Sequence, residues 1–258
     1  MLPTPSDPLA VLAADPVVAD AVAAARAEID ALLWRRDVRA AATEVAAASA
    51  ARGGRDSAVL DGADLPDVDD SPMGRTLDAA LRITEAVPGQ VDVFTRAPLQ
   101  VIAHLHSLGA ASFLDDDERG RPRTADLADD PLTLGSLPSA DVARERLTLL
   151  GALLTRETHA PALVVAAIAH AEIATARPFA WGSGLVARAM TRLVLASRGV
   201  DPSLFSIPEL GIVTSGRTKY VRALQGYQSG TTEGVAAFIA WHAAAVAEGA
   251  RAVVVPTH

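Results

Sequence analysis

The segment from Arg177 to Arg188, RPFAWGSGLVAR, has residue types and a spacing suited to binding an anion. Gly182 and Gly184 flank Ser183 just before an expected helix, so the backbone can turn and direct several N–H groups at one point. The helix dipole places partial positive charge at that same point. Arg188 follows about one turn into the helix, where its guanidinium can bind two oxygens of one anion. This pattern predicts a phosphate-binding turn. A plain helix–helix corner, with Arg188 paired to a surface carboxylate, would need the same glycines.

Helices are expected to position this turn, because the composition favours an all-α fold. Hydrophobic residues make up 50% of the 258 residues and aromatic residues only 4%, and alanine supplies much of the difference. Alanine is the best helix former and a poor strand residue. Apolar residues recur with helical periodicity, and no convincing strand alternation is present. We expect helices over residues of about 8–32, 35–51, 74–87, 98–108, 139–156, 161–177, 184–198, 216–228 and 232–249.

Two segments between these helices read as breaks. The stretch 51–57, ARGGRDS, is expected to end a helix, and an acidic, proline-containing loop follows at 61–74. Residues 112–138 form the longest polar region, and we expect a surface loop there that could include a small β-hairpin. Residues 1–54 are expected to form a helical extension and residues 55–250 the main helical domain, the two making one compact unit.

Composition also narrows the classes of partner. With no cysteine the chain has neither disulfides nor thiolate metal ligands. The net charge of −8 argues against nucleic acid as a partner. The N-terminus lacks the features of a signal peptide, and the longest apolar run, residues 160–169, is about half the length that spans a bilayer. We therefore expect a cytoplasmic protein without a membrane partner; a homo-oligomer stays open.

The order of residues in the turn resembles the signature of the Fic (Fido) family, H-P-F-x-[DE]-G-N-G-R-x-x-R. Pro178, Phe179, Gly182, Gly184 and Arg188 match it. Proteins of that family typically transfer AMP from ATP to a hydroxyl side chain of a target protein. The resemblance implies a Fic-like helical bundle in which a flap precedes the signature.

Further segments extend the resemblance over residues of roughly 55–245. KYVRALQGYQ at 219–228 and FIAWH at 238–242 are similar to later elements of the family. LHSLGAA at 105–111 and GRPR at 120–123 are similar to the helix and the Gly-x-x-Arg turn before the flap.

The departures from the signature fall on the residues that do chemistry. Arg177 stands where the family has its general base, and an arginine stays protonated at physiological pH. Trp181 replaces the acidic residue that holds Mg²⁺, so neither Mg²⁺ nor another metal is expected. Leu185 replaces the first arginine, and Ser183 replaces the asparagine. Loss of a positioned base alone costs roughly 10²–10⁴-fold in rate.

The sequence therefore predicts a degenerate Fic-type protein that binds a nucleotide or another phosphate anion without standard AMP transfer. No cofactor is required, and ATP is a candidate ligand. Trp181 could stack on a base or a target side chain, or simply pack. The predicted anion-binding residues are Arg177, Phe179, Trp181, Gly182, Ser183, Gly184 and Arg188.

Two alternatives stay open. The first is an active nucleotidyl or phosphoryl transferase with a rebuilt site, in which a residue such as Glu172 supplies the base. The second is a module that binds a protein or peptide by adding a strand to the flap.

The resemblance also implies an inhibitory segment. Many Fic proteins carry a helix with the motif [ST]-x-x-x-E-[GN], whose glutamate pairs with the final arginine of the signature. Ser57, Asp61 and Gly62 stand in that pattern here. Asp61 is one methylene shorter than glutamate, and an ordinary loop acid beside a turn glycine is the alternative.

The histidines carry no predicted site. His104 and His106 lie two residues apart on one expected helix, as do His170 and Glu172, so the members of each pair point to different faces. We expect these histidines to be core or surface residues.

Overall fold

The computed structural model describes residues 7–256, and these residues form helices joined by loops without a β-strand. The α-helices are α1 (Pro8–Ala13), α2 (Pro16–Trp34), α3 (Arg36–Ala40), α4 (Ala42–Leu60), α5 (Pro72–Ala86), α6 (Val91–Phe94), α7 (Pro98–Gly109), α8 (Ala140–Thr155), α9 (Ala162–Ala176), α10 (Ser183–Ser197), α11 (Pro208–Ser215), α12 (Arg217–Gln228) and α13 (Thr232–Arg251). Short 3₁₀ helices span Val87–Gln90 and Ala110–Ser112. No helix of the described part is long and apolar enough to cross a membrane.

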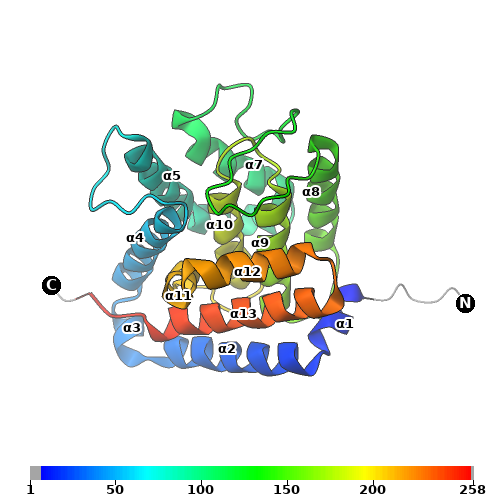
Figure 1. The fold of residues 1–258 in the computed structure, drawn as a ribbon. Coiled ribbons are helices and arrows are strands. Elements are labelled where there is room, and N and C mark those ends of the chain that lie inside the picture. Colours follow the sequence, from blue (N-terminus) through cyan, green and yellow to red (C-terminus); the bar gives the residue numbers. More distant parts are fainter. Residues whose placement is uncertain (1–6, 257–258) are drawn as a thin grey trace, which may run out of the picture.

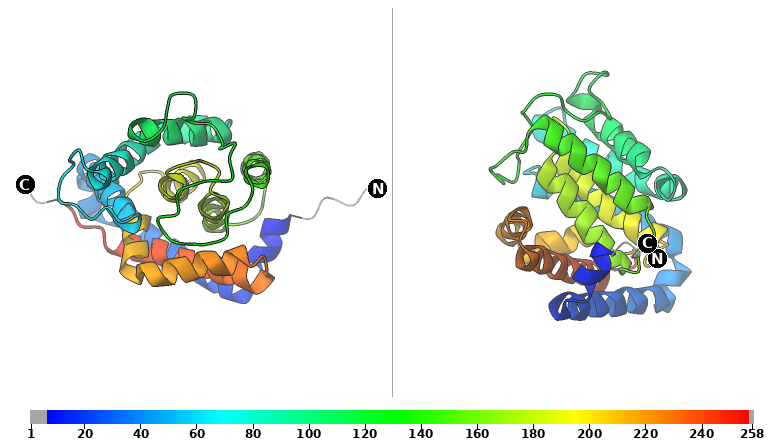
Figure 2. Two further views of the ribbon diagram at one scale, coloured as in Figure 1. Left: turned by 45° about the horizontal axis from the view of Figure 1, so that its top comes forward. Right: turned by 90° about the vertical axis from the view of Figure 1, so that its right-hand side faces the viewer.

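Helices α9 and α10 form the antiparallel centre of the molecule, and the other helices surround them (Figures 1 and 2). Every side chain of α9 except that of Glu172 is buried, as expected for a helix that is apolar on all faces. The turn that joins α9 to α10 lies at one end of this bundle, beneath the loop that connects α7 with α8 (Figure 2, left).

The N-terminal helices pack on the same body. The apolar face of α2, which includes Val18, Val22, Ile29 and Leu32, is buried, and α2 packs along α13 (Figure 1). Helix α4 packs against α5 and α11. The predicted division between residues 54 and 55 falls inside α4.

The predicted break at residues 51–57 is wrong, because α4 runs through it. Gly53 and Gly54 are buried helical residues. A Cβ atom on Gly53 would collide with the Arg192 guanidinium, and one on Gly54 would lie 2.9 Å from Leu81 Cδ2. These glycines allow close helix packing here, so tertiary contact overrides their low helix propensity.

The loop from Phe113 to Ser139 contains no hairpin, which corrects that part of the prediction. One buried arginine holds it in place of strand pairing. The Nε, Nη1 and Nη2 atoms of Arg123 donate to the carbonyls of Arg177, Ala125 and Pro138 at 2.8, 2.7 and 2.5 Å. The Arg123 N–H also donates to the Pro178 carbonyl at 2.8 Å, so the loop is fixed to the α9–α10 turn.

Candidate anion-binding turn

Two residues in the left-handed backbone region bound the α9–α10 turn. Arg177, the C-cap of α9, has φ +45°, and Gly182, the N-cap of α10, has φ +77°. The second is an ordinary use of glycine, whereas the first is rare for a residue with a long side chain. The turn therefore ends one helix and starts the next within six residues, with the amide of the N-cap Gly182 bonded to the loop.

Arg188 lies inside the protein and is paired there. Its side chain is 1% exposed; Nε donates to Ser57 Oγ at 2.6 Å, and Nη2 lies 2.8 Å from Asp61 Oδ2. Burial opposes the charge, but the Asp61 carboxylate and the Tyr220 hydroxyl outweigh it, and the pKa of Arg188 is raised. Asp61 thus reaches Arg188 despite its shorter side chain, because it is the C-cap of α4 and α4 ends beside the turn.

The Asp61 carboxylate also lies against the first turn of α10. A Cβ atom on Gly184 would lie 3.3 Å from both Asp61 oxygens and 3.2 Å from Arg188 Nη1. Asp61 Oδ1 and Arg188 Nη1 are buried and have no hydrogen-bond partner among the described residues. The Asp61 carboxylate therefore lies beside the first turn of α10, where the helix dipole favours negative charge, without a hydrogen bond to the α10 amides.

Arg177 points its charge into the loop. Its Nη1 lies 2.9 Å from Asp130 Oδ2, and its Nη2 donates to the carbonyls of Gly135 and Ser136 at 3.1 and 2.5 Å. The side chain is 5% exposed. Oxygens of the loop therefore bind the Arg177 guanidinium, which was predicted to bind an anion.

Asp129, one residue earlier in the loop, adds a second carboxylate at the turn. Its Oδ2 accepts the Gly182 N–H at 3.1 Å. Burial raises the pKa of Asp129 to about 7, and the neighbouring Asp61 adds to this rise. Asp129 and Asp130 escaped the sequence analysis because acids in a long polar loop usually point to solvent. Their position before Pro131, in ADDP, was the available signal.

The remaining predicted residues build the turn. Phe179 is 1% exposed and stacks on His106 at 3.8 Å, and the Phe179 N–H donates to Ser183 Oγ at 3.2 Å. Trp181 is partly exposed, and its ring stacks on Phe113 at 3.7 Å. Gly62, with φ +90°, follows Asp61 at the end of α4.

His106 supports the turn from α7. Its Nδ1 accepts the Gly120 N–H at 2.8 Å, which leaves the proton on Nε2 for the Trp181 carbonyl at 3.0 Å. Burial lowers the pKa of His106 to about 4, so the ring is neutral at physiological pH. It is a core histidine with a structural contact, as expected.

A buried polar network extends from Arg188 into the core. Tyr220 is a buried neighbour of Arg188 that contributes to its raised pKa, and the Tyr220 hydroxyl is 2.7 Å from His170 Nε2. His170 Nδ1 lies 3.1 Å from Thr191 Oγ1, which in turn lies 3.0 Å from His242 Nε2. Burial raises the pKa of Tyr220 to about 12 and lowers that of His170, so both stay neutral.

The space at the turn is too small for a phosphate. The cavity between the turn and the loop holds about 10 Å³, at most one water molecule. Glu172 lies outside its lining: it accepts from Arg146 Nε at 2.8 Å and from the Tyr227 hydroxyl. Within residues 7–256, no group of three or more His, Asp or Glu side chains is arranged to hold a metal ion.

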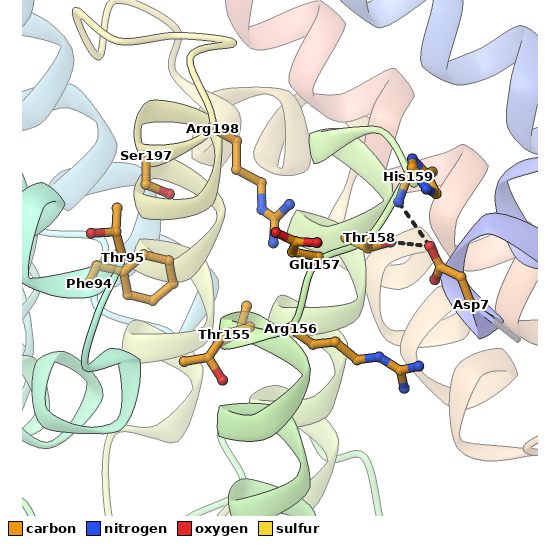
Figure 3. Close-up of a pocket in the computed structure, with 11 residues that line it drawn as sticks. Asp7, Phe94, Thr95, Thr155, Arg156, Glu157, Thr158, His159, Ser197 and Arg198 are labelled. Atoms are coloured by element: carbon orange, nitrogen blue, oxygen red, sulfur yellow. Dashed lines mark hydrogen bonds between the residues drawn. The ribbon is translucent and has the colours of Figure 1, made fainter. Parts of the chain in front are cut away.

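A larger cavity of about 650 Å³ lies at the other end of α10, roughly 20 Å along that helix. Figure 3 shows Arg156 and Arg198 among the residues that line it. They are the C-caps of α8 and α10, where basic residues offset the helix dipole. Their positions are explained by the helices themselves and assign no ligand.

Comparison with known proteins identifies the fold. No family model and no curated protein matches the sequence. A Fic family protein from Desulfovibrio desulfuricans G20 aligns in structure over 92% of this chain and 73% of its own, with TM-score 0.74 and 19% identity. Fic-1 from C. elegans (residues 134–508) aligns over 91% and 72%, with TM-score 0.67 and 17% identity. Its E274G variant aligns over 95% and 74%, with TM-score 0.56 and 19% identity. The chain therefore has the Fic fold.

Proposed function

We propose that this Fic-fold protein binds a nucleotide or another phosphate anion at the N-terminus of α10, in competition with its own Asp61, and does not carry out standard AMP transfer. The observation that supports this most is the buried contact between Arg188 and Asp61 at 2.8 Å. The Arg188 guanidinium binds this carboxylate beside the N-terminus of α10, and guanidinium groups and helix N-termini both attract phosphate.

The residue types at the turn weigh against standard AMP transfer. Arg177 cannot accept a proton at physiological pH, and its guanidinium is engaged by Asp130 and two carbonyls. Trp181 offers no metal ligand, so the developing charge of a phosphoryl transfer would lose a main stabiliser. The ligand is therefore expected to bind and leave unchanged.

The contacts of Glu172 weigh against a rebuilt transferase. Arg146 and Tyr227 already use both of its carboxylate oxygens. Strand addition has no support either, because the described part of the loop offers no strand edge for a peptide.

The test is titration calorimetry with ATP, ADP, GTP and inorganic phosphate. Asp61→Ala and Asp61→Asn should bind one of these ligands at least tenfold more tightly than the unchanged protein. The Asn variant keeps the shape of the side chain and guards against a folding defect. Asp64→Ala, which removes an exposed acid three residues away, is the matched control and should change nothing.

Two results would contradict the proposal. If neither Asp61 variant shows saturable binding of any of the four ligands at millimolar concentration, the turn is only a structural corner. If α-labelled ATP transfers label to protein in lysate with Mg²⁺ or Mn²⁺, the protein is a transferase.

A further inference from the structure

We propose that Arg177 is a positioning residue that holds loop 129–136 closed over the N-terminus of α10, as a second lock separate from Asp61. The inference rests on the proposed function, since it concerns access to the same anion site. The two mechanisms that block the site differ. Asp61, at the end of α4, competes with the anion, whereas the loop covers the site.

The contacts of Arg177 converge on this loop. The guanidinium binds the Asp130 carboxylate at 2.9 Å and the carbonyls of Gly135 and Ser136 at 3.1 and 2.5 Å. One side chain therefore joins the first and last parts of the loop to the end of α9. Buried hydrogen bonds to a charged group are among the stronger ones in proteins.

Asp130 organises the loop that Arg177 holds. Its Oδ1 accepts the Leu134 N–H at 2.9 Å, and its Oδ2 accepts the Gly135 N–H at 3.0 Å. The carboxylate that binds Arg177 thus also fixes the internal shape of the loop. Loss of the Arg177 contact should loosen the whole segment rather than one residue.

The closed loop places its own groups on the α10 N-terminus. The Asp129 N–H donates to the Ala180 carbonyl at 2.9 Å, and its carboxylate accepts the Gly182 N–H at 3.1 Å. The loop also supplies Pro131, Leu132 and Leu134 to the lining of the small cavity, whose volume is about 10 Å³. A phosphate cannot fit there until the loop moves.

The two locks share no residue. Asp61 pairs with Arg188, and Arg177 pairs with Asp130. Removing one leaves the contacts of the other intact. An anion would reach its full affinity only after both contacts are broken. We therefore expect a substitution of Arg177 to increase the affinity further when it is combined with a substitution of Asp61.

The test variant has to respect the backbone at Arg177. Its φ of +45° suits asparagine, one of the few non-glycine residues that tolerate this region, so Arg177→Asn removes the guanidinium with little strain. Arg121→Asn, at an exposed arginine of the Phe113–Ser139 connection but outside residues 129–136, is the matched control. Asp130→Asn keeps one carbonyl oxygen for the loop amides and serves if Arg177→Asn fails to fold.

Hydrogen exchange measures opening without any ligand. In Arg177→Asn, the amides of Asp129 and Gly182 should exchange at least tenfold faster than in the unchanged protein. They should be unaffected in Arg121→Asn and in Asp61→Ala. Unchanged exchange in both Arg177→Asn and Asp130→Asn would overturn the second lock.

Titration with inorganic phosphate and ATP then separates the two proposals. The double variant Asp61→Ala/Arg177→Asn should bind at least tenfold more tightly than Asp61→Ala alone, and equal affinity would count against the second lock. Faster exchange with no binding by any variant would retain the loop contact and overturn the proposed anion site.

Discussion

At the scale of single residues, the site is defined by which carboxylate each arginine binds. Arg188 takes Asp61 from α4, and Arg177 takes Asp130 from the loop. Both arginines are almost fully buried, and removing one partner from such a pair is costly because it strands the other charge. The pairs are therefore expected to respond strongly to substitution and to an external anion that can replace the lost partner.

Asp61→Ala should be destabilised without ligand and regain stability with phosphate. Leaving the buried Arg188 without its partner costs about 3–5 kcal/mol. A phosphate anion that binds there at 100 times its Kd restores about 2.7 kcal/mol. Thermal unfolding with 0 to tens of millimolar phosphate checks this, with sodium chloride at equal ionic strength as control. A phosphate-independent midpoint would speak against the anion site.

Asp129 should make the closed loop dependent on pH. Its pKa is about 7 in the closed structure, mainly through burial, against the usual 3.8 once the loop opens; Asp61, Asp130 and Arg177 are the charged groups near it. The closed form thus holds the proton more tightly. The contribution of Asp129 to the closed form is greatest below about pH 4, falls as the pH rises towards 7, and changes little above that.

Hydrogen exchange of the Gly182 amide between pH 4 and 8, corrected for intrinsic rates, measures this effect. Asp129→Asn keeps an acceptor for that amide and should abolish the trend. A trend that persists in the variant would assign it to another group.

At the scale of elements, close approach explains the glycines of α4. Gly53→Ala and Gly54→Ala should each destabilise the protein by about 1–3 kcal/mol, since the added methyl collides with Arg192 or Leu81. Gly226→Ala in α12, where the nearest atom to an added Cβ is 3.8 Å away, should stabilise by up to about 1 kcal/mol through helix propensity. Urea denaturation distinguishes these signs, and stabilisation at Gly53 or Gly54 would refute the packing explanation.

Helix periodicity predicted most of the helices, including the ends of α9 and α10 around Pro178 and Gly182. It missed α6 and α11, which have only four and eight residues. Periodicity also misread Gly53 and Gly54 as the end of a helix. These glycines are needed for close packing against residues of other helices, which the local sequence does not reveal. At the site, order in the chain pointed to Arg188 and Asp61. The partners of Arg177 could not be predicted, because Asp130 is brought to it only by folding of a loop without regular structure.

At the scale of the whole molecule, the N-terminal helices behave as part of one body. The apolar face of α2 is buried and packs along α13, and α4 supplies Ser57 and Asp61 to the turn. Removal of residues 1–34 should therefore expose the face of α13 and lower the thermal midpoint by several degrees or cause aggregation. The full chain should unfold in one transition. A separate early transition, absent after truncation, would show that α2 folds independently.

The attachment of Asp61 to the chain sets a threshold for any outside ligand. A tethered competitor acts at an effective concentration that reaches the millimolar range for short flexible connections, and it is never diluted. A free anion must therefore outcompete the tethered Asp61 carboxylate. Its apparent affinity for the unchanged protein will be much weaker than its intrinsic affinity for the site without that carboxylate.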